Sequence, residues 1–412
     1  SDQHRGWFQS SMFSSMIIHG KPCAKTILTH GFTIDEKHKK MSKSIGNVIA
    51  PESVAKRYGT DVLRLWAAGT DFERDVVVSD DIFKNVAEVF RKIRNTCRFM
   101  VSNLYDFAPQ VGVEVSEFKI FAGKIPVLQL SPDFTSLQQE VTISALDRFI
   151  LGKTLQLSDE IRAAYSEYHF TSIVQKLNSF CTHDLSACYL DIVKDRLYVE
   201  AKDGALRKSA QKTLSIVLDI ITKLMAPVLS FLAEEISDHY QGDKKDSIHV
   251  QSFADRAPLE QMLERWDEAF VKPLDDITEH DATKLWPLLE LVRSEVLRAI
   301  EDLREVGTVK HSLESSITLF IDGNLEDGAF FLRLIKGLEH CEGLKRFFKD
   351  WFIISEITFA ASEETLQPTA LPWLFVQVER ASGIKCPRCW HWEESGVGNV
   401  DGLCGRCQKL VC

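Results

Sequence analysis

The sequence has little cysteine and no long apolar run. Its longest largely apolar stretch, residues 224–233, has ten positions and includes Pro227 and Ser230, whereas a membrane-spanning helix needs about 18. Ten cysteines among 412 residues are too few for a disulfide-stapled scaffold. The absence of repeats and low-complexity tracts excludes collagen-like and wholly disordered proteins. The chain starts at Ser1 without an apolar signal stretch, so we expect an interior cut from which no targeting can be inferred.

What is present is an ordinary globular composition, with 45% hydrophobic and 26% charged residues. At about 150 residues per domain, the length predicts two to four domains. The net charge of −10 argues weakly against a protein that coats nucleic acid. It leaves room for a local basic patch, for example along residues 84–98, because binding follows the local field.

Apolar residues at helical spacing predict long helices in the first two thirds of the chain. The ranges are 79–107, with Ser79 as N-cap, then 145–168, 172–198 and 205–240. Pro227 should split the last of these. Successive long helices of this kind indicate an antiparallel bundle.

The remaining segments have mixed patterns. Residues 1–75 combine short apolar runs with turn signals, which is typical of α/β structure, and residues 108–141 are predicted as a connection with a strand at 125–130. Towards the C-terminus, a small α/β unit is predicted from two helices and three strands: helices 286–306 and 329–341, and strands 316–321, 352–359 and 373–378.

Two Cys-x-x-Cys pairs lie near the C-terminus: Cys386, Cys389, Cys404 and Cys407. Each pair turns two thiolates toward one point, and two pairs supply a closed tetrahedral set. A closed set leaves no open position for a substrate, so the metal would be structural. Zn²⁺ is the expected metal because it accepts four soft sulfur ligands; two disulfides or an iron–sulfur cluster are the alternatives.

The same segment carries aromatic and guanidinium groups, namely Arg388, Trp390, Trp392 and Arg406. Such groups suit unstacked nucleic-acid bases, which offer a flat face and hydrogen-bonding edges. The alternatives are that the tryptophans pack over the cysteine knuckles and that the arginines are solvated.

The segment Lys40-Met41-Ser42-Lys43-Ser44 is followed by Gly46 and Asn47. Two lysines three apart, with nearby hydroxyls, can surround a polyphosphate and neutralise charge that grows as pyrophosphate leaves. Gly46 would allow the loop to move. A solvated basic loop is the alternative for such a pattern of Lys, Ser and Gly.

Taken together, these strings resemble isoleucyl-tRNA synthetases of the bacterial or organellar type. KMSKS is a signature of class I aminoacyl-tRNA synthetases. The isoleucyl type within that class is indicated by four longer strings: SDQHRGWF, LTHGF, KKMSKSIGNVI and the CPRCW…CGRC ending. The strings SALDRFIL, KDRLYVEA and MAPVLSFLAEEI resemble the helical tRNA-binding domain of that family. The HIGH-type motif and the editing domain of the family are not found in these 412 residues.

The resemblance implies roles for individual residues. Lys43 and Lys40 would act on the ATP phosphates as the catalytic groups. Asp2, Gln3, Trp7 and His30 would contact the adenylate or the isoleucine side chain, with Trp7 as a pocket wall and His30 near the adenosine. The four cysteines would bind one Zn²⁺, and Arg388 and Trp390 would contact the anticodon loop.

The resemblance also implies a multidomain architecture. Residues 1–75 would be the end of a Rossmann-type α/β catalytic domain with the KMSKS loop, and residues 76–141 a connecting helix and linker. An all-α anticodon-binding bundle would follow at 142–250, a small α/β junction domain at 251–380 and a zinc-binding module at 381–412.

The implied function is attachment of isoleucine to tRNA-Ile with ATP and Mg²⁺ through an isoleucyl-adenylate, with the isolated 412-residue chain inactive alone. The alternatives are a stand-alone tRNA-binding module and a synthetase paralogue without aminoacylation activity. We expect a cytoplasmic monomer without membrane contact, or else a mitochondrial or plastid location.

Overall fold

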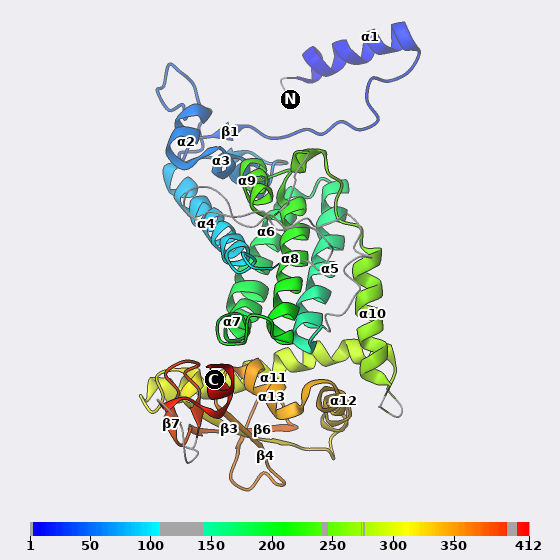
Figure 1. Ribbon diagram of the computed structural model, residues 1–412. Helices are drawn as coiled ribbons and strands as arrows, with labels where there is room; N and C mark the ends of the chain where they lie inside the picture. Colours follow the sequence, from blue (N-terminus) through cyan, green and yellow to red (C-terminus); the bar gives the residue numbers. More distant parts are fainter. Residues whose placement is uncertain are drawn as a thin grey trace. The chain divides into compact units, whose positions relative to one another are not determined.

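The computed structural model describes residues 3–107, 143–240, 246–272, 274, 277–393 and 402–411 (Figure 1). The chain forms two compact units, Ser1–Ala87 and Glu88–Cys412. The strand expected at 125–130, together with Asp2, lies outside the described residues. Among the helices that are described, none is both long enough and apolar enough to cross a membrane.

The first unit is small and mixed α/β, as expected for residues 1–75. After a π-helical turn, His4–Phe8, its elements are α1 (Gln9–His19), β1 (Thr33–Ile34), α2 (Pro51–Tyr58), α3 (Thr60–Gly69) and β2 (Val76–Val77). β1 and β2 pair in parallel. The core of the unit forms where α2 and α3 meet the start of α4 (Asp80–Ser102), with the Phe83 ring against Tyr58 and Trp66.

The predicted cap of α4 is confirmed. The Ser79 hydroxyl accepts a hydrogen bond from the Ile82 backbone at 3.2 Å, and Asp80 and Asp81 lie in the first turn, where acidic groups suit the helix dipole. The helix ends at Ser102, five residues before the predicted end.

The second unit begins with a helical bundle. Its helices are α5 (Ala145–Ser166), α6 (Phe170–Ser179), α7 (Leu190–Tyr198), α8 (Ala205–Met225) and α9 (Ser230–Tyr240). A ten-residue π-helix, Phe180–Tyr189, joins α6 to α7, so the stretch predicted as a single helix changes register in its middle. The predicted break at Pro227 is confirmed, since it lies between α8 and α9.

Cross-helix pairs establish that the bundle is antiparallel, as predicted. Later residues of the α6–α7 stretch contact progressively earlier residues of α5: Lys176 with Glu160, Asp184 with Lys153, and Tyr189 with Asp147. The chain then reverses again, because Ser209 near the start of α8 also bonds to Asp147. Figure 1 shows the resulting row of long helices.

Asp147 is the polar centre of this bundle and is fully buried. It accepts hydrogen bonds from the hydroxyls of Ser144, Tyr189 and Ser209. Burial, followed by the neighbouring carboxylate, raises the pKa of Tyr189 well above its usual value. A buried carboxylate is tolerated only when its oxygens are saturated in this way.

The small α/β unit at the C-terminal side is also present. Its sheet has the order β4-β3-β6-β5, made of β3 (Ser315–Ile321), β4 (Glu356–Phe359), β5 (Gln367–Pro368) and β6 (Leu374–Arg380). β3 pairs in parallel with β4 and antiparallel with β6. The helices are α10 (Ala257–Val271), α11 (Glu279–Glu305), α12 (Glu326–Glu342) and α13 (Leu344–Phe352).

Two predicted boundaries in this unit are wrong. The strand predicted at 352–359 exists only as β4, because Phe352 ends α13 and Ile353 takes a left-handed conformation (φ 58°) that breaks the chain direction. The helix predicted at 286–306 begins earlier, since Thr278 and Asp281 form a capping box that starts α11 at Glu279. Pro287 is accommodated inside that helix.

Candidate phosphate loop and metal centre

The KMSKS segment of the first unit follows a tight hairpin organised by Asp35. One Asp35 oxygen accepts hydrogen bonds from the backbone N–H groups of Lys37 (2.9 Å) and Lys39 (2.8 Å). The backbone of Ile34 also forms an isolated bridge with Lys40. The hairpin therefore places Lys40 at the end of a fixed turn.

Asn47 closes the same loop from its far side. Its side-chain N–H donates to the other Asp35 oxygen (2.8 Å) and to the Lys40 carbonyl (3.4 Å), and its carbonyl accepts from the Ser42 backbone (2.9 Å). The hydrogen bond from Asn47, with smaller help from backbone N–H groups, holds the pKa of Asp35 below its usual value. The Asn47 side chain thus connects the Asp35 hairpin to the KMSKS segment, and residues 35–47 together are called the lysine loop below.

The two lysines of the loop have different surroundings. The Lys40 ammonium lies 4.9 Å from the centre of the Phe32 ring, a cation–π distance. Lys43 is exposed and forms no ion pair within the part of the chain that the structure describes. Gly46, which ends the turn, has a positive φ of 73°, a conformation that favours glycine. The loop therefore presents the Lys43 ammonium to solvent on a braced backbone.

The other predicted residues of this unit are exposed. Gln3 accepts a backbone bond from Phe8 through its carbonyl, and the Trp7 side chain is 68% exposed. His30 contacts the carbonyl of its neighbour Gly31 at 2.8 Å. At Gly31 a Cβ atom would collide with the Arg74 carbonyl, so this glycine allows the close approach of the two segments that lead into β1 and β2.

The four predicted cysteines converge in the second unit. Their sulfur atoms all lie within 4.8 Å of one another, and all four residues are buried. Tetrahedral Zn–S bonds of about 2.3 Å correspond to sulfur separations of about 3.8 Å, close to the 3.5 Å between Cys389 and Cys404. The donor set therefore fits zinc in a closed, structural site.

Backbone hydrogen bonds shape this metal site. The N–H of Trp390 donates to the Cys386 carbonyl (2.9 Å), and the N–H of Cys386 donates to the His391 carbonyl (2.9 Å). The N–H groups of Cys404 and Cys407 point at sulfur atoms, at 3.4 Å each. Such N–H to sulfur bonds stabilise thiolates, the form that binds metal.

The four cysteines belong to a C-terminal segment, residues 381–393 and 402–411, called the metal module below. Its aromatic and basic residues fall into two groups. Trp390 is 54% exposed, with the Lys385 ammonium 4.8 Å from its ring, and it has a left-handed φ of 66°. Trp392 is half-buried, with the guanidinium of Arg380 5.1 Å from its ring centre. Of the two tryptophans, it is therefore Trp392 that packs against the α/β unit. Arg388 is half-buried and donates toward the Cys407 sulfur at 3.7 Å, where it offsets thiolate charge.

Arg406 is not a solvated arginine. It pairs with Asp195 of α7 through two hydrogen bonds of 2.7 Å each. Asp35, Asn47 and Asp195 are the functional candidates that sequence reasoning missed. The only available signal was the Gly-Asn pair that follows KMSKS, and nothing near Asp195 in sequence indicates its partner 211 positions later.

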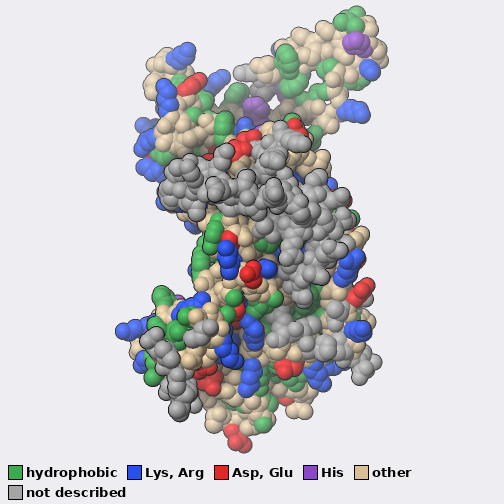
Figure 2. Space-filling view, viewed as in Figure 1, with side chains coloured by type: hydrophobic (Ala, Val, Ile, Leu, Met, Phe, Trp, Pro, Cys, Tyr) green, Lys and Arg blue, Asp and Glu red, His purple; other side chains and the backbone are tan. Residues whose placement is uncertain are grey.

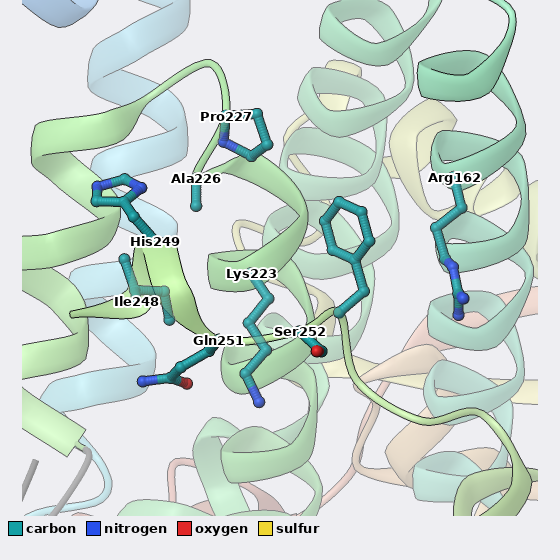
Figure 3. A pocket seen from close by; sticks show the side chains of 9 residues that line it. Arg162, Lys223, Ala226, Pro227, Ile248, His249, Gln251 and Ser252 are labelled. Atoms are coloured by element: carbon teal, nitrogen blue, oxygen red, sulfur yellow. The ribbon is translucent and has the colours of Figure 1, made fainter. Parts of the chain in front are cut away.

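A cavity of about 570 Å³ beside the helical bundle is lined by nine residues, three of which are basic (Figure 3). Lys223 is paired with Asp219 at 2.8 Å, His249 contacts the Ser230 carbonyl, and Arg162 lies over Phe253. Each basic group already has a partner within the bundle. On the outer face shown in Figure 2, basic and acidic side chains are interspersed.

Two family models match the chain. Residues 1–79 match the class I tRNA synthetases for I, L, M and V, and residues 147–319 match the anticodon-binding domain of tRNA ligases. An isoleucine–tRNA ligase of Nitratidesulfovibrio vulgaris aligns with the whole of this chain and is 37% identical to it over 417 aligned residues. The chain belongs to the isoleucine–tRNA ligase family.

Further relatives in this family have the same extent of match. An isoleucine–tRNA ligase of Alcanivorax borkumensis is 36% identical over 99% of this chain, and one of Geobacter sulfurreducens is 36% identical over all of it. The chain spans 38–39% of the length of these relatives. The family resemblance predicted from the sequence is confirmed.

The brace in the lysine loop leads to a prediction for Asn47→Ala. Loss of its bonds should raise the pKa of Asp35 toward the ordinary value and open the loop, so that a lysine-directed protease cuts at Lys40 or Lys43 about tenfold faster. Carboxyl NMR titration and timed proteolysis measure the two effects. Ser44→Ala is the matched control, and equal cleavage of both variants would contradict the brace.

The pH dependence of the brace follows from the sign of the Asp35 shift. Because the pKa of Asp35 is lowered in the folded loop, the brace is complete above the ordinary carboxyl pKa. It is lost as pH falls through the folded-state pKa. Carboxyl NMR titration of Asp35 should therefore give a midpoint below the usual value.

The cysteine set leads to a second prediction. Cys404→Ser should reduce bound zinc from one ion per chain to well below one and unfold the metal module, because structural zinc binding is coupled to folding. Atomic absorption after gel filtration measures the metal, with Cys23→Ser, an exposed free cysteine, as the control. Stoichiometric zinc in Cys404→Ser would refute the four-cysteine site.

Proposed function

We propose that this chain serves in the attachment of isoleucine to tRNA-Ile, contributing the ATP-phosphate loop, an anticodon-binding bundle and a structural zinc module. The observation that carries the proposal is the match along the whole chain to isoleucine–tRNA ligases, combined with an exposed Lys43 on a braced loop. The matched relatives are longer, so the reaction is assigned to the chain as a contributor.

The proposed reaction has two steps. An oxygen of the isoleucine carboxylate attacks the α-phosphorus of ATP, the bond to the bridging oxygen breaks, and pyrophosphate leaves with the electron pair. A ribose hydroxyl of tRNA then attacks the activated carbonyl, loses its proton and releases AMP. Mg²⁺ would accompany ATP and share its phosphate charge.

Residues 40–47 would supply charge stabilisation in the first step. As pyrophosphate leaves, negative charge grows on its oxygens, and a cation held nearby lowers the barrier without itself reacting. Lys43 is the candidate for direct contact and Lys40 for support, since Lys40 already lies over Phe32. Rigidity of the backbone between Asp35 and Asn47 would keep both ammonium groups in position.

The remaining assignments in the first unit follow the family resemblance. Asp2 and Gln3 are proposed to contact the adenylate, and His30 the adenosine side. Trp7 is proposed as a wall of the isoleucine pocket, and its 68% exposure leaves its ring free for that contact.

Trp390 and Arg388 are proposed to contact the anticodon loop. A bulky residue with a left-handed φ costs about 1–2 kcal/mol, and Trp390 keeps this conformation while presenting its ring to solvent. An exposed ring near a lysine suits stacking on an unpaired base next to a phosphate. Zn²⁺, when bound, would supply only the fixed shape of the surrounding knuckles.

The test is binding of the chain to tRNA-Ile and to the same tRNA with an altered anticodon, at two salt concentrations. Recognition predicts a clear loss of affinity with the altered anticodon at both. Phosphate contacts alone would give salt-sensitive binding that ignores the anticodon, and that result would refute the assignment of the bundle and module to anticodon recognition.

Trp390→Gly sharpens this test. Glycine relieves the left-handed strain, so zinc content and melting temperature should be kept or raised. Affinity for tRNA-Ile should fall about 5- to 150-fold, the effect of losing one stacked base. Trp7→Gly, which removes an exposed tryptophan of the first unit, is the control, and unchanged affinity in Trp390→Gly would contradict the contact.

A further inference from the structure

The C-terminal end of α7 is a junction for three parts of the second unit. Asp195 uses both carboxylate oxygens to accept hydrogen bonds from Arg406 of the metal module. The next residue, Arg196, donates to Ser144 at the start of α5 (2.7 Å) and to Asp350 of α13 (3.1 Å). One helical turn therefore bonds to the bundle, the α/β unit and the metal module.

An apolar contact accompanies these polar ones. Val199, the C-cap residue of α7, is 7% exposed and belongs to the same buried cluster as the four cysteines, with Leu403 packed against it. The core of the metal module thus includes a side chain from the bundle. A module with so few apolar residues of its own depends on such a contact to exclude water.

Further contacts hold the module from other sides. Glu200 lies 3.8 Å from Arg406 and 3.5 Å from Arg346 of α13. The N–H of Trp392 donates to the Ser355 hydroxyl at 2.7 Å. The acidic pair Asp195 and Glu200 is thereby the attachment point for two arginines from different segments.

The geometry of the Asp195–Arg406 pair is more specific than that of an ordinary surface ion pair. Two parallel N–H···O bonds fix the angle of the guanidinium plane as well as its distance. Arg406 immediately precedes the ligand Cys407, so its angle also sets the orientation of the metal cluster. Trp390, on the other cysteine pair of that cluster, moves with it.

We propose that Asp195 is a positioning residue: it fixes the orientation of the metal module on α7 so that Trp390 and the bundle contact a single RNA, and it slows loss of the metal. The first part of this proposal rests on the proposed function. The second part concerns only the chain and its zinc, and it is measured without RNA.

The test compares Asp195→Asn with Asp191→Asn in the zinc-loaded chain. Asp191 lies one turn earlier on α7 and pairs with Lys194 at 2.7 Å, and both side chains are about half exposed. Asp195→Asn should keep one zinc per chain and the melting temperature of the bundle. It should transfer zinc to a chromogenic chelator about tenfold faster, and its preference for tRNA-Ile over the altered-anticodon tRNA should fall about tenfold.

The outcomes separate the two proposals. If the unmodified chain shows no anticodon preference, the proposed function fails, and the zinc-transfer rate alone decides whether Asp195 holds the module. If the unmodified chain has a preference and Asp195→Asn matches Asp191→Asn in both measurements, the positioning role is overturned.

A second variant covers the case in which Asp195→Asn loses its zinc. Asp195→Glu keeps the charge but lengthens the side chain by one methylene, which displaces the guanidinium of Arg406. Positioning predicts retained zinc with a reduced anticodon preference. A full preference in Asp195→Glu would show that charge alone is needed and would overturn a role for orientation.

Discussion

Four buried sulfur atoms within 4.8 Å of one another impose the main constraint on the C-terminal part of this protein. As thiolates they repel strongly at that spacing in a poorly solvated site, and a cation among them removes the repulsion. Arg388, which donates toward Cys407, offsets part of the remaining charge. The module has little other core, so its shape depends on the metal and on its contact with α7.

The contact with α7 connects the metal module to the helical bundle. Asp195 bonds to Arg406 of the module, and Val199 packs against its cysteines. Arg196, which lies between them, donates to Ser144 and lies 3.9 Å from the buried Asp147. The polar centre of the bundle is thus linked to the metal cluster through Arg196 and Asp195 of α7 and then through Arg406. The proposed RNA-binding surface of bundle and module would need this kind of fixed relation, because bases are read at hydrogen-bond distances.

Sequence reasoning succeeded where local spacing carries the information. The helical periodicity of the bundle, the break at Pro227 and the two Cys-x-x-Cys pairs all depend on residues close together in the chain. No helix was predicted for α13, and its last residue, Phe352, was assigned to the following strand. Its nine residues carry Phe347, Phe348, Trp351 and Phe352, and aromatic residues also suit strands. The π-helix at Phe180–Tyr189 was missed because apolar spacing does not distinguish helical registers.

The site was predictable to a similar extent. Lys40, Lys43 and the four cysteines lie inside recognisable strings, whereas Asn47 braces the loop through three hydrogen bonds that only the folded loop reveals. For Arg406 the sequence suggested a base contact or a solvated position, because its actual partner, Asp195, is 211 residues away. Long-range pairs of this kind depend on tertiary structure and leave no local pattern.

Hydrogen exchange of the chain with and without zinc measures how strongly the metal cluster and α7 are coupled. If the metal cluster and α7 form one structural unit, removing zinc should speed exchange in residues 384–393 and 402–411 and also in the last turn of α7. The cores of α5 and α8 should keep their protection. Faster exchange confined to the module, with residues 195–199 unchanged, would show that the metal cluster and α7 are not coupled.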